Sequence, residues 1–99
     1  MRRYTTTIHR FPLPFDEAQV ADFRLTYVQD GEIVLEKTKA DMTVKGKVWS
    51  IKLTQQETAR FAVGYAVAQI RLLTTEGDAP ASNDMRFYVS GVYNEEVLE

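Results

Sequence analysis

The stretch that decides the fold is Phe23-Arg24-Leu25-Thr26-Tyr27-Val28, followed by Gln29-Asp30-Gly31 and then by Glu32-Ile33-Val34-Leu35-Glu36-Lys37. Phe23, Leu25 and Tyr27 alternate with polar residues, and a period of two is typical of a strand with one buried face. An Asp-Gly pair between two such segments indicates a β-hairpin. The stretch therefore predicts two antiparallel strands joined by a tight turn.

The length of the hairpin loop is argued from the side chains that it brings together. A two-residue loop, Asp30-Gly31, places Leu25 opposite Glu36. A three-residue loop that includes Gln29 pairs Leu25 with Leu35 and keeps one face apolar. Because a slip by one residue turns a strand inside out, we predict the three-residue loop, with a bulge at a left-handed glycine.

Similar alternation recurs along the rest of the chain. Strands are expected over residues 4–11, 23–28, 32–37, 40–44, 47–53, 66–74 and 79–92, with a Lys45-Gly46 turn in the second hairpin. The capping box Thr54-Gln55-Gln56-Glu57 predicts one or two helical turns over residues 55–60. The stretch Phe11-Pro12-Leu13-Pro14-Phe15 is expected to cross between sheets in extended form, since proline disfavours helix at the residue before it.

These elements predict an all-β fold, an immunoglobulin-like antiparallel β-sandwich of about seven strands with one short helical turn near residues 55–60. The chain has 99 residues, so we expect one domain over residues 1–99, with Trp49 at the centre of its core. Residues 93–99 are expected to form a frayed acidic tail.

Composition excludes several classes of function. The chain has no cysteine, which excludes disulfides, zinc–thiolate sites and thiol chemistry. With Lys+Arg 12 and Asp+Glu 14, the net charge is −2, which disfavours tight electrostatic binding to nucleic acid or to an anionic membrane. The basic N-terminus runs into threonines rather than an apolar segment, so no secretory signal is expected. We expect a soluble protein.

Few residues could support catalysis or metal binding. His9 is the only histidine and is expected at the surface or at a strand edge, and no nucleophile elbow supplies a serine partner. Glu76, Asp78 and Asp84 lie near one turn without the spacing of an EF-hand loop. We therefore predict a protein that is not an enzyme, with no catalytic residues, no cofactor, no metal and no small-molecule substrate.

Several motifs resemble, in their order, a known group of proteins. They are Phe11-Pro12-Leu13-Pro14-Phe15-Asp16, Tyr27-Val28-Gln29, Lys37-Thr38 with Asp41, Leu53-Thr54-Gln55-Gln56-Glu57-Thr58 with Phe61, Gln69-Ile70-Arg71, Ala81-Ser82 and Glu96-Val97-Leu98. This order resembles small, mostly uncharacterised structural proteins of phages and prophages of Gram-positive bacteria. It is more loosely similar to the all-β N-terminal domain of phage baseplate upper proteins. The resemblance implies a structural or accessory role in tail, neck or baseplate assembly, in a virion assembled in the host cytoplasm.

With catalysis and metal binding not expected, the remaining class of function is binding to another protein, because edge strands and chain ends can pair with a partner. The expected partners are other phage structural proteins or a second copy of the chain. The candidate contact residues are Arg3, Tyr4, Gln69, Arg71, Val97 and Leu98. The alternative is a small binding module for a carbohydrate or host-surface ligand, which predicts exposed aromatic residues grouped on one face.

Overall fold

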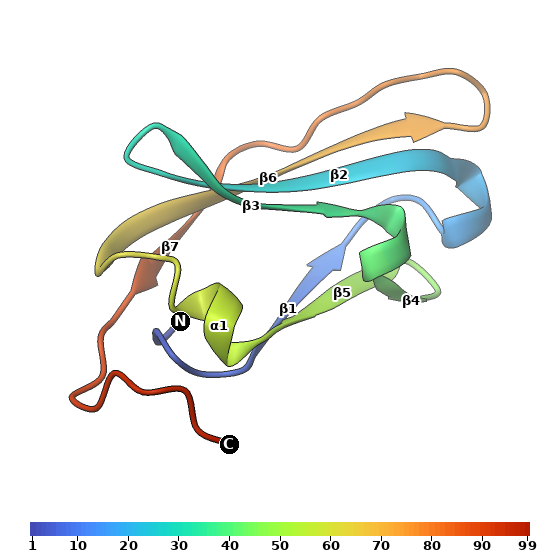
Figure 1. Ribbon diagram of the computed structural model, residues 1–99. Helices are drawn as coiled ribbons and strands as arrows, with labels where there is room; N and C mark the ends of the chain where they lie inside the picture. Colours follow the sequence, from blue (N-terminus) through green and yellow to red (C-terminus); the bar gives the residue numbers. More distant parts are fainter.

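Seven strands form two antiparallel sheets packed face to face in the computed structural model, which describes residues 1–99 (Figure 1). The three-stranded sheet has the order β1 (Thr7–Pro12), β5 (Val48–Leu53) and β4 (Thr43–Lys45). The four-stranded sheet has the order β3 (Glu32–Thr38), β2 (Val20–Gln29), β6 (Gly64–Thr74) and β7 (Met85–Val89). The predicted all-β sandwich is confirmed.

The core lies between the inward faces of the two sheets. Phe23 of β2 and Trp49 of β5 come from different sheets and stack with ring centroids 4.9 Å apart and planes 10° from parallel. Both side chains are fully buried. The indole Nε1–H of Trp49 donates to the Phe15 carbonyl at 3.1 Å. The proline-rich segment therefore crosses between the sheets, as predicted, and is fixed against the core.

Three short helical segments connect the strands: η1 (Glu17–Gln19), η2 (Lys39–Asp41) and α1 (Gln55–Thr58). The predicted capping box begins α1, with Glu57 N donating to Thr54 Oγ1 at 3.2 Å and Thr54 N donating to Glu57 Oε1 at 3.0 Å. The two 3₁₀ segments were not predicted. The second one replaces the start of the strand expected at residue 40, so that β4 begins at Thr43.

The loop of the β2–β3 hairpin differs from the prediction. Gln29 pairs with Glu32, so the loop has two residues, and Asp30 and Gly31 have φ of 53° and 77°. Positive φ at both positions is the type I′ geometry, which matches the twist of the flanking strands. The apolar face is restored by a bulge, because Tyr27 pairs with Leu35 and Val34 has no partner on β2.

The second hairpin is also shifted by one residue from the prediction. Its loop is Gly46-Lys47, with Gly46 at φ 60°, because glycine takes a left-handed conformation without a steric penalty. Val44 then lies opposite Trp49. As a consequence, Lys45 belongs to β4 and lies opposite Val48 instead of forming the turn.

The two ends of the chain lie close together near α1 (Figure 1). The predicted first strand begins at Thr7, not Tyr4, which has φ 59°. Before it, Ser90 N donates to Met1 O at 2.8 Å and Arg3 N donates to Ser90 O at 2.9 Å, so residues 1–3 extend the edge of the sheet beyond β7. Residues 93–99 contain no helix or strand.

Within the structure, none of the helices has the length and apolar character needed to cross a membrane.

Replacing Phe23 with alanine is expected to lower the free energy of unfolding by about 3–5 kcal/mol, because the change empties one half of the stack between the sheets. Urea denaturation followed by the fluorescence of Trp49, the single tryptophan, measures this directly. The control is Ile33→Ala, at a side chain 63% exposed. It should change stability by less than about 0.5 kcal/mol. Equal losses in the two variants would contradict the central position of the stack.

Candidate functional site

The outer face of the three-stranded sheet carries side chains that the core does not use. Strand alternation turns them away from the inward-facing Phe11, Trp49 and Ile51. They line a shallow groove of about 440 Å³. The seven residues are Ile8, Arg10, Thr43, Lys45, Val48, Ser50 and Lys52, and together they are called the cationic face.

The register of the strands fixes the arrangement of the cationic face. Arg10 lies opposite Ser50, and Ser50 lies opposite Thr43, so these residues form one row across the three strands. The Ser50 hydroxyl donates to the Thr43 carbonyl at 3.1 Å. In the neighbouring row, Val48 lies beside Lys45.

The remaining row completes the face at the end nearest α1, where Ile8 lies opposite Lys52. Ile8 and Val48 are 49% and 41% exposed. The face therefore combines three cations, two aliphatic side chains and two hydroxyl groups.

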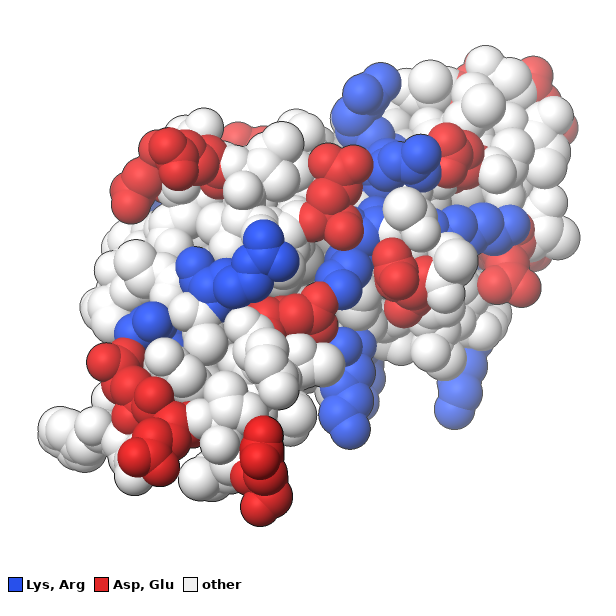
Figure 2. Space-filling view, in the orientation of Figure 1, with Lys and Arg blue, Asp and Glu red and all other residues white.

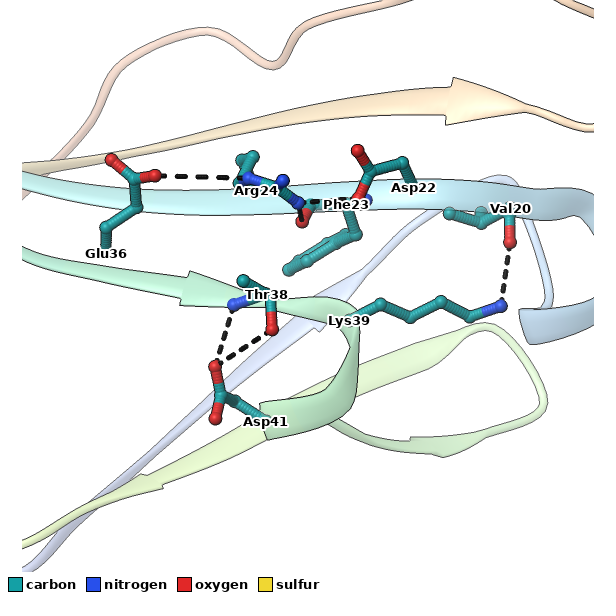
Figure 3. A network of polar contacts seen from close by, with 8 residues as sticks. All are labelled: Val20, Asp22, Phe23, Arg24, Glu36, Thr38, Lys39 and Asp41. Carbon is teal, nitrogen blue, oxygen red and sulfur yellow. Dashed lines mark hydrogen bonds and ion pairs between the residues drawn. The ribbon is translucent and has the colours of Figure 1, made fainter.

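Two basic side chains, one on the four-stranded sheet and one beside it, have polar partners (Figure 3). Arg24 Nη1 donates to Asp22 Oδ1 at 2.5 Å, and Arg24 Nε lies 3.9 Å from Glu36 Oε1. Lys39 Nζ donates to the Val20 carbonyl at 2.7 Å. Their charge is thus neutralised or engaged within the protein.

The three cations of the cationic face have no such partners. Neither an ion pair within 4.0 Å nor a side-chain hydrogen bond involves Arg10, Lys45 or Lys52. In Figure 2, basic side chains project from the lower side of the molecule, where Figure 1 places the three-stranded sheet, and acidic side chains gather at the lower left, near the C-terminal tail. An unneutralised positive face on a chain of net charge −2 attracts anionic groups.

The only histidine lies on β1, an edge strand of the three-stranded sheet, as one of the two predicted alternatives had it, but its half-buried ring points into the sandwich rather than to the surface. His9 lies between Ile8 and Arg10, and strand alternation turns it inward when they point outward. Its Nδ1 lies 2.6 Å from the Tyr27 hydroxyl, and its ring contacts that of Phe87 at a centroid distance of 5.5 Å. Burial, and to a smaller extent the charged N-terminus, lower the pKa of His9.

Tyr27 and Glu57 complete this interior polar cluster. Burial, followed by the nearby Glu57 carboxylate, raises the pKa of Tyr27. Burial of Glu57 would raise its pKa, but hydrogen bonds from Lys37 and from the Thr54 backbone, together with the charge of Lys37, outweigh burial and lower it. The Lys37–Glu57 ion pair ties β3 to α1. Tyr27 is fully buried, His9 and Glu57 are partly buried, and none of the three lines a pocket.

No group of three or more His, Cys, Asp or Glu side chains is placed to hold a metal ion. The chain has one histidine and no cysteine, and the Nδ1 of that histidine faces the Tyr27 hydroxyl. The residues present therefore do not form a recognisable metal site.

The six predicted contact residues fall in two separate regions. Arg3, Tyr4, Val97 and Leu98 lie toward the end of the sandwich that carries α1, where Arg3 Nη2 donates to the Ala59 carbonyl at 3.1 Å. Gln69 and Arg71 lie on the outer face of the four-stranded sheet, where Gln69 Nε2 donates to Asp84 Oδ1 at 3.2 Å. None of the six belongs to the cationic face.

Sequence reasoning missed the cationic face for a specific reason. The available signal was the outward position of Arg10 and Lys52 on their alternating strands. Lys45 was predicted to lie in a turn. The order of strands in the sheet makes β1 a neighbour of β5, although the paired residues are about forty positions apart in the sequence. A local pattern does not specify that order.

Comparisons with known proteins bear on the fold. No known protein-family model matches the chain, and no curated protein matches it. The solved crystal structure of CopC from Methylosinus trichosporium OB3b does match, over 94% of this chain and 85% of the CopC chain, with a TM-score of 0.59 and 18% sequence identity. At this identity the likeness shows a shared β-sandwich fold.

The resemblance to phage and prophage structural proteins is therefore wrong. The sandwich matches CopC rather than a phage baseplate protein, and no family or curated match links the chain to a phage. The role in tail, neck or baseplate assembly and the location in a virion assembled in the host cytoplasm are overturned by the same finding. Nothing in the comparisons links the chain to a carbohydrate or host-surface ligand either.

The fold itself explains two of the motifs that carried the resemblance. The stretch that begins at Thr54 caps α1, and the proline-rich stretch from Phe11 to Phe15 crosses between the sheets. Motifs of this kind occur in unrelated chains, because only a few residue types form a helix cap or an extended segment between two sheets.

Acidification is expected to destabilise the fold through His9. The pKa of His9 lies below its ordinary value of 6.5 in the folded chain, so between these two values the unfolded chain binds more protons. This contribution to stability is fully present above the unfolded pKa and is lost as the pH falls through the folded pKa. His9→Asn, which does not titrate, should flatten the loss of stability below about pH 6.5, in the window between the unfolded and the folded pKa of His9.

Urea denaturation of both proteins at a series of pH values in that window makes the measurement, and carboxylates such as Glu57 titrate mainly below it. The same slope of stability against pH in both proteins would contradict the assignment to His9.

Proposed function

We propose that the chain is a non-enzymatic binding domain that recognises an acidic segment of a partner protein through the cationic face. The observation that carries the proposal is the presence of three cations without partners around two exposed aliphatic side chains, on one face of one sheet.

The two kinds of side chain on the face have different roles in binding. Covering Ile8 and Val48 removes apolar surface from water, which contributes about 25 cal/mol for each Å² that is buried. The three cations steer an acidic segment toward the face and disfavour a basic one, because complementary charge acts mainly on association rate and specificity. A segment that alternates carboxylate and aliphatic side chains satisfies both.

The charge and shape of the face favour a protein segment over other anions. Nucleic-acid binding typically uses about 6–10 phosphate contacts, and the face offers three cations on a chain of net charge −2. Pockets for small molecules bury about 70–90% of the ligand surface, whereas this groove is open along the sheet. An extended peptide needs neither a deep pocket nor a high density of charge.

The rest of the molecule supports a binding role without catalysis. The one histidine is engaged by Tyr27 inside the sandwich, and the interior polar cluster has no open cavity in which a substrate could reach it. The serines that alternation brings outward, such as Ser50, have no adjacent general base of the kind that activates a nucleophile.

The chain is expected to bind a labelled ten-residue peptide that alternates glutamate with valine and leucine, and to bind the glutamine counterpart of that peptide far more weakly. Reversing two charges, in Lys45→Glu with Lys52→Glu, should weaken binding of the glutamate peptide by about tenfold or more, since each close charge pair contributes up to about 1 kcal/mol. Fluorescence anisotropy at low and high salt makes the measurement.

The matched control reverses two exposed cations on other parts of the surface, in Arg71→Glu with Arg60→Glu. This control makes the same change in net charge and should keep the affinity of the original chain within a factor of about two. An equal loss of affinity in both variants would show that net charge, rather than the cationic face, governs binding. Equal affinity for the glutamate and glutamine peptides would overturn the proposal.

A further inference from the structure

The C-terminal tail of this chain has the chemistry that the cationic face is proposed to recognise. The tail, residues 93–99, reads Tyr93-Asn94-Glu95-Glu96-Val97-Leu98-Glu99. It carries three glutamates around two aliphatic residues. The cationic face carries three cations around two aliphatic side chains. The two sets are complementary in charge and in apolar content.

The tail is held in its present position by few contacts. Gln55 Nε2 donates to the Leu98 carbonyl at 2.9 Å, and Leu98 N donates to Gln55 Oε1 at 2.8 Å. Arg3 forms an ion pair with Glu95, whose side chain is 51% exposed. Exposed contacts of this kind contribute little to stability, with a median of about 0–1 kcal/mol for an ion pair. The tail can therefore leave this position at small cost.

The side chains of the tail would gain contacts if the tail left its position beside α1 and bound to the cationic face. Leu98 is 72% exposed, and Glu96 and Glu99 are exposed without an ion-pair partner. On the cationic face, Leu98 would be covered by Ile8 or Val48, and the glutamates would meet unpartnered cations. The exchange replaces weak surface contacts with burial of apolar surface and charge pairing.

The lengths of the tail and of the face agree. Seven residues in extended form span at most about 25 Å. A strand of six residues, such as β5, is about 20 Å long. The tail can thus cover the length of the face. While Gln55 of α1 holds Leu98, the tail does not lie on the cationic face of its own chain, so docking requires it to leave Gln55.

We infer that the tail of one copy of this chain docks on the cationic face of a second copy. The inference rests on the proposed function and names one occupant for the same surface. Because the tail and the face are different parts of the surface, the contact is heterologous, and it either reciprocates between two copies or propagates along a row of them. The contact area is small, so the association is weak and depends on concentration.

Sedimentation velocity of the full chain, from about 10 μM to about 1 mM, tests the inference in the range expected of a small interface. The mass should rise with concentration, and the rise should be smaller at high salt. The tail variant Glu96→Lys with Glu99→Lys and the face variant Lys45→Glu with Lys52→Glu should each raise the dissociation constant at least tenfold. All four sites are exposed and the four side chains form no ion pair in the fold, so folding is preserved.

Combining the two double variants in one chain provides the decisive measurement. The combined chain has two lysines in the tail, two glutamates on the face and the original net charge, because two Lys→Glu and two Glu→Lys changes cancel. Self-association should return in this chain. The matched control, Glu32→Lys with Glu76→Lys, makes the same charge change as the tail variant at exposed residues elsewhere and should associate at least as well as the original chain.

The outcomes separate this inference from the proposed function. A chain that stays monomeric at every concentration, yet binds the glutamate peptide, overturns the inference and leaves the proposed function in place. Loss of association in the face variant with none in the tail variant also overturns the inference, because another segment would then occupy the face. Failure to bind the glutamate peptide, together with a monomeric chain, overturns both.

Discussion

The stack of Phe23 on Trp49 is the interaction on which the other features of the sandwich depend. It joins the central strand β2 of one sheet to the central strand β5 of the other, with both rings fully buried. The Trp49 indole also holds the segment that crosses between the sheets, through the Phe15 carbonyl. Once these rings face each other, alternation turns their neighbours Ser50 and Val48 outward. The position of the core and the composition of the cationic face are thus two results of one constraint.

Side chains that imitate backbone pairing close the end of the sandwich near α1. The Gln29 amide donates to the Ala62 carbonyl at 2.7 Å and accepts from Ala62 N at 2.7 Å. The fully buried Thr58 hydroxyl accepts from Thr5 N at 3.0 Å and donates to the Thr5 carbonyl at 2.7 Å. Both satisfy backbone groups that have no strand partner, which would be costly if left unpaired in the interior. The Gln55 amide binds the tail in the same way, but at the exposed surface, where water can replace it.

The two hairpins show how turn chemistry and burial share control of register. In the first hairpin, Asp30-Gly31 takes the type I′ turn, and the bulge at Val34 then returns Leu35 to the core. The prediction assumed that the loop would lengthen to keep the face apolar, but the bulge meets the same requirement and leaves the favoured turn intact. In the second hairpin, the need for a left-handed residue places the loop at Gly46 and moves Lys45 onto a strand. That shift by one residue supplies one of the three cations of the candidate site.

The sequence by itself determined the fold class, the inward face of β2, the capping box of α1 and the crossing between sheets, because each depends on residues within a few positions of one another. The tertiary structure alone decided the loop registers, the inward orientation of His9 and the neighbourhood of Arg10, Lys45 and Lys52. The loop registers depend on turn geometry and burial together, and the other two depend on strand order, which places residues about forty positions apart opposite each other. The alternation of residues determines which side chains share one face of a strand. Only the pairing of distant strands determines which of these faces lie side by side and form one surface.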